Sequence, residues 1–223
     1  PTPLSGNAHA FSLFGLVPFF DLFSFMCPQN IHPIEDRILK RSERESSNKH
    51  RGGVFWLCGL SGSGKSTLAL ELEKLLFEKN IQNIVIDGDD VRNGLCKDLG
   101  FSMGHRKENV RRVSEMAKIM SRNGFVVIVC LISPTKSIRG DAKEIIGEDD
   151  FFEIFVKCSF EKCKQRDVKG LYAKLDNGEI ESFTGKDSTF EPPLTPWLLL
   201  DTENTSLASS MIKLSTAVMD EVT

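Results

Sequence analysis

The chain has 223 residues, 40% of them hydrophobic and 26% charged, and its formal net charge is −3 at neutral pH. Because α/β folds often reach this length as one unit, we expect one globular domain with attachments. The composition excludes a largely disordered protein, and the negative charge argues against a protein that binds nucleic acid through a basic surface.

The beginning of the chain differs in composition from everything after it. Phenylalanines crowd between Phe11 and Phe25, and no Lys or Arg occurs before Arg37. A membrane-spanning helix needs about 20 consecutive apolar residues, whereas Pro18 and Asp21 interrupt this run. We therefore predict no membrane anchor in this segment.

Three regions follow from these shifts in composition. We interpret residues 1–29 as a Phe-rich N-terminal extension that is poorly ordered. Residues 30–51 are dense in charge and Ser, which indicates an exposed linker or a short helix. The compact domain is predicted over residues 52–223.

The cysteines indicate the redox environment of the protein. They contain no CxxC pair, and several lie inside apolar runs, where a free thiol behaves as a small hydrophobic group. A reduced, intracellular protein fits this pattern, with the cytoplasm favoured over a plastid or mitochondrion-related organelle. The cysteines are Cys27, Cys58, Cys96, Cys130, Cys158 and Cys163.

From Gly52 onward, short apolar runs alternate with segments of helical length, which is typical of βαβ units. The runs are continuously apolar, so we expect parallel strands that are covered on both faces in a layered α/β domain. The predicted strands are Val54–Cys58, Ile84–Ile86, Phe125–Ile132, Phe151–Val156 and Leu198–Leu200.

Two of the intervening segments have a clear helical period, one after the first strand and one before the third. Residues 168–196 lose the pattern and are too long and polar for a simple connection, which favours a functional lid. The apolar positions of the two helices are Leu68, Leu72, Leu75 and Leu76, and Val110, Val113, Ala117 and Met120.

A phosphate-binding loop follows the first strand and opens a helix, which is the context that G-x-x-x-x-G-K-[ST] requires. Its backbone N–H groups and the helix N-terminus are expected to bind phosphates. Lys65 is expected to reach the β- and γ-phosphates, and Ser66 to hold Mg²⁺. A chance match in a Gly- and Ser-rich turn is disfavoured because both flanks fit. The nucleotide-binding residues are Gly59, Leu60, Ser61, Gly62, Ser63, Gly64, Lys65, Ser66 and Thr67.

Carboxylates stand at the end of the second strand and not of the third. Asp87 and Asp89 should face the ligand crevice, because residues at the carboxyl ends of parallel strands do so. They are candidates to meet the γ-phosphate, its Mg²⁺ and an acceptor hydroxyl, which favours a small-molecule kinase. The alternative is a turn-forming acidic pair.

Positive charge gathers after these carboxylates, which indicates an anionic substrate. Arg106 and Asn109 extend the apolar stripe of the helix that follows, so they should point into the cleft. Arg111 and Arg112 lie elsewhere on the helical turn, and a solvated face is at least as good an explanation for them.

At this point the sequence resembles adenylyl-sulfate kinases. The segments GLSGSGKST, DGDDVRNGL, DLGFS, RKENVRR, LISP, RDVKGLY, GEI and FTGKDSTFEPP stand in the order and spacing of that family, from about Asn30 to Val222. The resemblance implies a five-stranded P-loop kinase fold, usually a homodimer, that uses Mg²⁺ and ATP to phosphorylate the 3′-hydroxyl of adenosine 5′-phosphosulfate (APS). Some relatives are fused to ATP sulfurylase, so that enzyme is a further expected partner. No partner that is a nucleic acid or a membrane is expected.

The resemblance also implies roles for individual residues. Arg166 should lie beside the base of ATP, and Ser66 and Asp87 should hold the metal, directly or through water. Phe101 or Phe183 should stack on the adenine of the acceptor. The residues implied for APS are Arg92, Phe101, Arg106, Asn109, Ile132, Ser133, Lys169, Leu171, Phe183, Thr184 and Gly185.

Two mechanisms remain open for the transfer. The family has been described with a phosphorylated serine at the position of Ser133, but a serine nucleophile needs a base, and no His lies near it in the sequence. We favour direct in-line transfer in which Asp89 or Asp87 orients the hydroxyl and Lys65 stabilises charge. Alternative functions are a kinase for another small hydroxylated substrate, or a non-catalytic nucleotide-binding module that regulates an ATP sulfurylase.

Overall fold

The computed structural model describes residues 31–34, 37–179, 183–186 and 188–223. The chain divides into two units, Pro1–Ile38 and Leu39–Thr223. The extension predicted for residues 1–29, together with Cys27, lies outside the described residues. In the described part of the first unit, the backbone N–H of Arg37 donates to the carbonyl of Ile34 at 2.8 Å.

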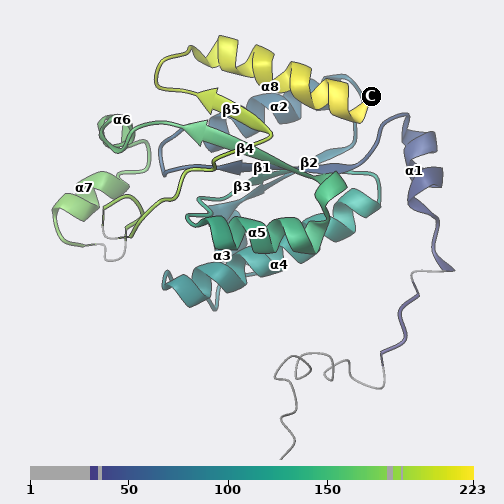
Figure 1. Cartoon of the computed structure of the whole chain (residues 1–223), viewed down its shortest axis with the longest axis horizontal. Coiled ribbons are helices and arrows are strands. Elements are labelled where there is room, and N and C mark those ends of the chain that lie inside the picture. The colour runs from purple at the N-terminus through teal and green to yellow at the C-terminus, as the bar shows by residue number, and fades with distance from the viewer. Residues whose placement is uncertain (1–30, 35–36, 180–182, 187) are drawn as a thin grey trace, which may run out of the picture. The chain divides into compact units, whose positions relative to one another are not determined.

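The second unit is built on a five-stranded parallel sheet with the strand order β2-β3-β1-β4-β5 (Figure 1). Each predicted strand is present, and the parallel α/β architecture is confirmed. Strand β1 occupies the centre and is buried along its whole length, as its continuous apolar run indicated. The strands are β1 Gly53–Cys58, β2 Asn83–Asp87, β3 Val126–Cys130, β4 Phe151–Lys157 and β5 Leu198–Asp201.

Helices cover both faces of this sheet (Figure 1). The two helices predicted from their apolar period are α2 and α4. Helix α1 lies in the segment predicted as a linker or a short helix, and the other helices were not predicted. The described helices are α1 Arg41–Asn48, α2 Lys65–Glu78, α3 Gly88–Asn93, α4 Met103–Arg122, α5 Lys136–Ile146, α6 Phe160–Arg166, α7 Leu171–Asp176 and α8 Leu207–Val222, with a 3-10 turn at Glu148–Asp150.

Alternate side chains of β1 enter two separate cores. Phe55 and Leu57 pack with apolar residues of α2 and α8, whereas Val54 and Trp56 pack with α4 and α5. This alternation follows from the two-residue period of a strand. The sheet is therefore held from both sides, and its carboxyl edge is left to carry the loops that form the site.

The third strand is shorter than predicted. It ends at Cys130, and Ile132 and Ser133 belong to the turn that follows. The turn departs from extended structure because Ser133 has a φ of +46°, in the left-handed region. Hydropathy alone could not detect this, since the apolar run continues through Ile132.

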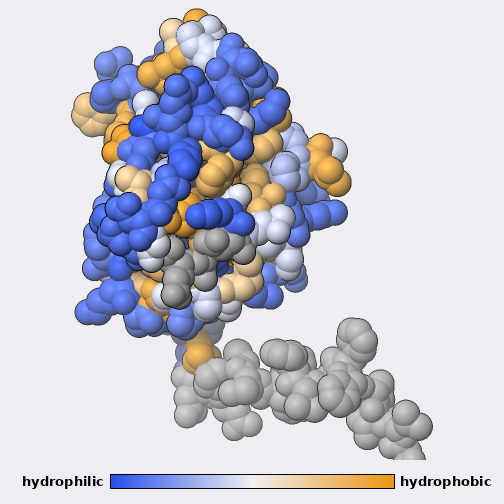
Figure 2. Space-filling view, turned by 90° about the vertical axis from the view of Figure 1, so that its left-hand side faces the viewer, coloured by the Kyte–Doolittle hydropathy of each residue, from blue (hydrophilic) through white to orange (hydrophobic). Residues whose placement is uncertain are grey.

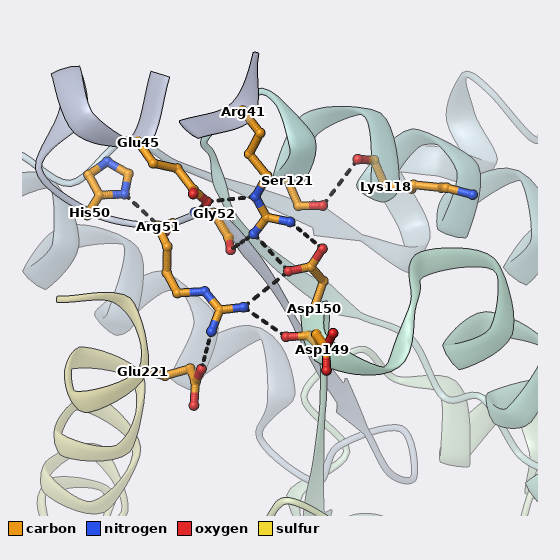
Figure 3. Close-up of polar contacts among 10 residues, drawn as sticks. All are labelled: Arg41, Glu45, His50, Arg51, Gly52, Lys118, Ser121, Asp149, Asp150 and Glu221. Atoms are coloured by element: carbon orange, nitrogen blue, oxygen red, sulfur yellow. Dashed lines mark hydrogen bonds and ion pairs between the residues drawn. The ribbon is translucent and has the colours of Figure 1, made fainter. Parts of the chain in front are cut away.

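Helix α1 belongs to the compact unit Leu39–Thr223. Figure 3 shows the contacts that attach it. The guanidinium of Arg41 donates to both carboxylate oxygens of Asp150, at 2.5 and 2.8 Å, and to the carbonyl of Gly52 at 2.8 Å. Arg51 pairs with Asp150 and, at 2.6 Å, with Glu221 of α8. These ion pairs join residues far apart in the sequence. Helix α1 itself agrees with the short helix that was one of the two expectations for residues 30–51.

Replacing Asp150 by Asn is expected to destabilise the fold most at neutral pH. Burial raises the pKa of the Asp150 carboxyl, but hydrogen bonds and charges from Arg41 and Arg51 outweigh burial and hold that pKa below its ordinary value. Such a group stabilises the fold above its unfolded pKa of about 4 and loses this effect as the pH falls through the folded value. The loss should be about 1.5–3 kcal/mol, or roughly 3–10 °C in thermal midpoint.

Asp149→Asn is the matched control for this prediction, because in the described structure Asp149 is contacted through its backbone: its carbonyl accepts from Nη2 of Arg51 at 2.8 Å. Thermal unfolding of both variants should be followed at pH 7 and at pH 3. We expect the difference in thermal midpoint between Asp150→Asn and the parent to be smaller at pH 3 than at pH 7. Equal midpoints for the two variants at pH 7 would mean that the ion pairs stabilise nothing.

The described cysteines are buried free thiols. Burial raises the pKa of Cys58 to about 12 and that of Cys130 to about 12, so both stay protonated at neutral pH. Within the described residues, no helix is both long and apolar enough to cross a membrane.

Candidate active site

The phosphate-binding loop connects β1 to α2 at the carboxyl edge of the sheet. Gly59, Gly62 and Gly64 have φ values of +149°, +77° and +104°, which side chains rarely permit. At Gly59 an added Cβ would also lie 2.5 Å from the carbonyl of Val156. The glycines therefore let the loop turn tightly against β4, and the N-terminus of α2 follows directly with its positive dipole end.

Lys65 is the first residue of α2 and is 8% exposed. Its Nζ donates to the carbonyls of Gly59 at 2.9 Å and of Leu60 at 2.7 Å. Burial lowers the pKa of this ammonium. No carboxylate is among its described contacts that would offset this effect. An anionic phosphate would satisfy this buried charge.

The two predicted carboxylates have different environments. Asp87 caps α3: its Oδ1 accepts from the N–H of Asp89 at 2.9 Å, while its Oδ2 accepts from Ser66 Oγ at 2.8 Å. Asp89 is exposed and forms an ion pair with Lys169, from the segment between α6 and α7. Ser66 and Asp87 thus place a hydroxyl and a carboxylate together, the hard oxygen donors that Mg²⁺ prefers.

Two arginines flank Phe101, which lies just before α4. The guanidinium carbon of Arg92 lies 4.4 Å from the ring centroid of Phe101, and that of Arg106 lies 6.0 Å from it. Arg106 also donates to Thr184 Oγ1 at 2.8 Å. Burial, and for Arg106 also the positive charge of Arg92, lower the pKa of both guanidinium groups. An anion bound here would relieve that unfavourable charge density.

Asn109 lies on the buried side of α4 and is 3% exposed. Its Nδ2 is buried without a hydrogen-bond partner among the described residues. Because unsatisfied buried donors are uncommon in folded proteins, this amide is a candidate ligand group.

Arg166 and two residues that the sequence analysis did not include, Thr202 and Tyr172, contact the phosphate-binding loop. Arg166 was predicted, and its Nη2 donates to the carbonyl of Thr202 at 2.5 Å. Thr202 Oγ1 in turn donates to the carbonyl of Ser63 at 2.6 Å. The hydroxyl of Tyr172 on α7 donates to the carbonyl of Ser61 at 2.8 Å. No motif marks Thr202, and only the fold brings the β5–α8 connection to the phosphate-binding loop.

A single cavity of about 690 Å³ joins these groups, on the side where α6 and α7 lie in Figure 1. Figure 2 looks onto this face, where apolar surface lies between hydrophilic side chains. The predicted residues that line the cavity are Ser61, Gly62, Gly64, Lys65, Ser66, Thr67, Asp87, Asp89, Arg92, Phe101, Arg106, Asn109, Ile132, Ser133, Arg166, Lys169, Leu171, Phe183 and Thr184.

Four predicted residues are not in that lining. Gly59 and Ser63 lie in the phosphate-binding loop without facing the cavity, and Leu60 and Gly185 line a second cavity of about 620 Å³ instead. The lining also includes unpredicted residues of the β5–α8 connection and of α8, namely Thr202, Thr205, Leu207 and Ser210. Of the segments predicted as a lid, residues 180–182 and 187 lie outside the described part of the chain.

Ser133 is 2% exposed and its hydroxyl is occupied. Its Oγ accepts a hydrogen bond from Nε1 of Trp56 at 2.9 Å. Among its described contacts there is no base that could remove its proton, which a serine nucleophile requires. The geometry therefore supports a structural role for this side chain.

His105 is one of the residues that depart from the sequence pattern of the family that the motifs resemble. His105 stands where those kinases usually have Asp, and in this structure its Nδ1 accepts from the N–H of Gly100 at 2.9 Å. The ring thus supplies an acceptor, as a carboxylate would, to the loop before Phe101.

A model of the family described as adenylylsulphate kinase matches residues 51–201. The chain belongs to the adenylylsulphate kinase family. The adenylyl-sulfate kinase of Bacteroides fragilis strain ATCC 25285 is 46% identical over 193 residues, which cover 86% of this chain and 96% of the relative. The adenylyl-sulfate kinase of Bacillus licheniformis is 51% identical over 168 residues, or 75% of this chain and 85% of the relative.

A solved structure agrees with this family membership. The APS kinase CysC of Mycobacterium tuberculosis, solved in complex with AMPPNP and APS, has a TM-score of 0.73 and 42% sequence identity. The match covers 76% of this chain and 98% of that one.

Proposed function

We propose that this protein transfers the γ-phosphoryl group of ATP to the 3′-hydroxyl of APS, giving 3′-phosphoadenosine 5′-phosphosulfate and ADP. One observation carries the proposal: a single cavity joins the phosphate-binding loop to the Arg92–Phe101–Arg106 cluster. The first feature suits a nucleoside triphosphate, and the second suits a planar base with an anionic tail. Family membership supports the same reaction.

The ATP end of the cavity is assigned to the phosphate-binding loop and its neighbours. Backbone N–H groups of the loop and Lys65 bind the phosphates, while Arg166 and Thr202 lie beside the base. Ser66 and Asp87 hold Mg²⁺ directly or through water, consistent with their 2.8 Å contact. An ion held by these two residues would supply positive charge close to the phosphates of ATP.

The different contacts of the two carboxylates support different roles for them. Asp87 is engaged by Ser66 and by the N–H of Asp89, so it is suited to the metal. Asp89 is exposed, lines the cavity and forms an ion pair with the side chain of Lys169. We assign Asp89 to orient the 3′-hydroxyl and to accept its proton as the hydroxyl oxygen attacks the γ-phosphorus in line.

The competing functions are tested by one measurement. ADP release from ATP should be followed with APS, with other small hydroxylated acceptors, and with no acceptor. We expect release that depends on APS. Release with another acceptor but not APS would favour a different small-molecule kinase, and no release would favour a non-catalytic module. Intact Lys65, Ser66, Asp87 and Asp89 in the cavity argue against the module.

Arg106→Ala is expected to weaken use of APS while sparing ATP. Arg106 lines the cavity next to Phe101, away from the phosphate-binding loop. Losing one charge-assisted contact costs about 1.5–3 kcal/mol, so kcat/KM for APS should fall roughly 10–100-fold. The measurement is steady-state kinetics with each substrate varied in turn.

Arg111→Ala is the control, because Arg111 lies on the same helix, is exposed and pairs with Glu108. It should leave both kinetic constants close to those of the parent. An Arg106→Ala protein that loses ATP binding but keeps its affinity for APS would reverse the assignment of the two ends of the cavity.

The assembly state is a further part of the proposal. The resemblance implies a homodimer and an ATP sulfurylase partner, and both stay predictions. A solved relative is described as a hexameric APS kinase from Thiobacillus denitrificans, at 27% identity and a TM-score of 0.58. This chain covers only 31% of that relative, so its assembly is not a guide to this one.

A further inference from the structure

The turn after β3 holds a backbone conformation that is costly by itself. Ser133 has a φ of +46°, which is uncommon for any residue other than glycine. It also precedes Pro134, and the ring of a following proline restricts the backbone further. Such outliers cost of order 1–3 kcal/mol and persist only where surrounding contacts determine them. The conformation of this turn therefore depends on the contacts that hold Ser133.

Two buried side chains hold Ser133. Trp56 donates to its hydroxyl at 2.9 Å, and Nη1 of Arg139 donates to its carbonyl at 2.8 Å. Arg139 lies on α5 and its side chain is 4% exposed, and Nε lies 2.6 Å from a carboxylate oxygen of Glu153 in β4. The Nε edge of the planar guanidinium therefore lies against Glu153 of the sheet, while Nη1 points to the turn.

The same guanidinium reaches the chain that returns from the predicted lid. Its Nη2 donates to the carbonyl of Glu191 at 2.8 Å. The N–H of Glu191 donates to the carbonyl of Pro134 at 2.8 Å, and the Glu191 carboxylate accepts from the N–H of Lys136 at 2.7 Å. Next to it, Phe190 stacks on Phe155 at 5.9 Å. Phe190 and Glu191, near the end of the predicted lid, are thus held against the Ser133 turn, β4 and the start of α5.

Both segments held by Arg139 border the same part of the cavity. The turn contributes Ile132, Ser133 and Pro134 to the lining. The segment that precedes Glu191 contributes Phe183 and Thr184. Thr184 also accepts from Arg106. The ATP end is built from other elements, namely the phosphate-binding loop, Arg166 and the β5–α8 connection.

We propose that Arg139 is a positioning residue for the acceptor: its buried guanidinium fixes the Ser133 turn and the end of the lid together, and so sets binding of APS and not of ATP. This inference rests on the proposed function for the identity of the acceptor. It assigns no chemical step to Arg139, which does not line the cavity. A lysine keeps the charge but lacks the planar set of donors, so it cannot serve Glu153, Ser133 and Glu191 at once.

The test compares Arg139→Lys with the parent in steady-state kinetics. Misplacing a binding surface by about 1 Å can cost up to 10²-fold, so KM for APS should rise roughly 10–100-fold while KM for ATP changes less than about twofold. Lys143→Ala is the matched control, because Lys143 lies one turn further along α5 and forms only an exposed ion pair with Glu148. It should change neither constant.

A second variant guards against poor folding of Arg139→Lys. Glu191→Ala removes the acceptor for the Lys136 N–H, keeps its own backbone contacts and leaves no buried charge unpaired. It should raise KM for APS selectively, by roughly threefold to tenfold, less than Arg139→Lys does. Equal increases of both KM values in either variant, or no change in KM for APS, would overturn the inference.

Limited proteolysis separates failure of this inference from failure of the proposed function. In the absence of substrates, both variants should be cleaved faster than the parent between residues 177 and 197, because the end of that segment is released. Unchanged cleavage in both variants would overturn the anchoring role, whatever the activity. A parent protein that releases no ADP with APS, yet shows faster cleavage in the variants, would refute the proposed function while the anchoring role stands.

Discussion

Replacing Lys65 by Ala should lower kcat by about 10²–10³-fold or more while the domain stays folded. The ammonium is buried at the start of α2, and in this structure it contacts only backbone carbonyls of the phosphate-binding loop among the described atoms. A preorganised charge at a transferring phosphoryl group contributes on this scale. Burial lowers the pKa of Lys65, so the charge is held at a cost and its removal should not unfold the protein.

Lys74→Ala is the matched control, since Lys74 lies on the same helix and forms an exposed ion pair with Glu71. The measurement is single-turnover formation of ADP with both substrates saturating, after thermal unfolding shows that each variant is folded. Near-parental turnover in a folded Lys65→Ala protein would contradict the assignment of the phosphate site.

Asp89→Asn should be the most damaging change on the acceptor side. The amide keeps the size of the side chain but cannot accept the proton of the attacking hydroxyl, and general-base catalysis contributes typically 10²–10⁴-fold. We therefore expect kcat to fall by about 10²-fold or more, with KM for ATP little changed. Asp89 is exposed, so loss of its ion pair with Lys169 should affect stability only slightly.

The neighbouring Asp90→Asn serves as the control, because Asp90 is exposed and lies outside the cavity lining. Both variants remove one negative charge, and the two positions are adjacent in the sequence. If Asp90→Asn lost as much activity as Asp89→Asn, the effect would be one of net charge near α3. If Asp87→Asn alone abolished transfer and Asp89→Asn did not, the hydroxyl would have to be oriented by Asp87.

The local chemistry of the sequence was enough to predict the sheet and the nucleotide end of the site. Strands buried on both faces appear as continuous apolar runs, and each predicted run is a strand in the fold. The phosphate-binding loop is recognisable because its glycines, its lysine and its hydroxyl act within eight consecutive residues. Asp87 and Asp89 could be placed because the carboxyl ends of parallel strands share one edge.

The tertiary structure decided what depends on contacts between distant segments. Helix α1 is polar in composition, and its place in the compact unit rests on ion pairs from Arg41 to Asp150 across the fold. Thr202 carries no motif and joins the site only because β5 ends beside the phosphate-binding loop. Arg139 resembles any helical arginine in the sequence, and its role follows from burial among Glu153, Ser133 and Glu191. Spacing along a chain records local periodicity, whereas which charges are buried together is set by the packing of the whole domain.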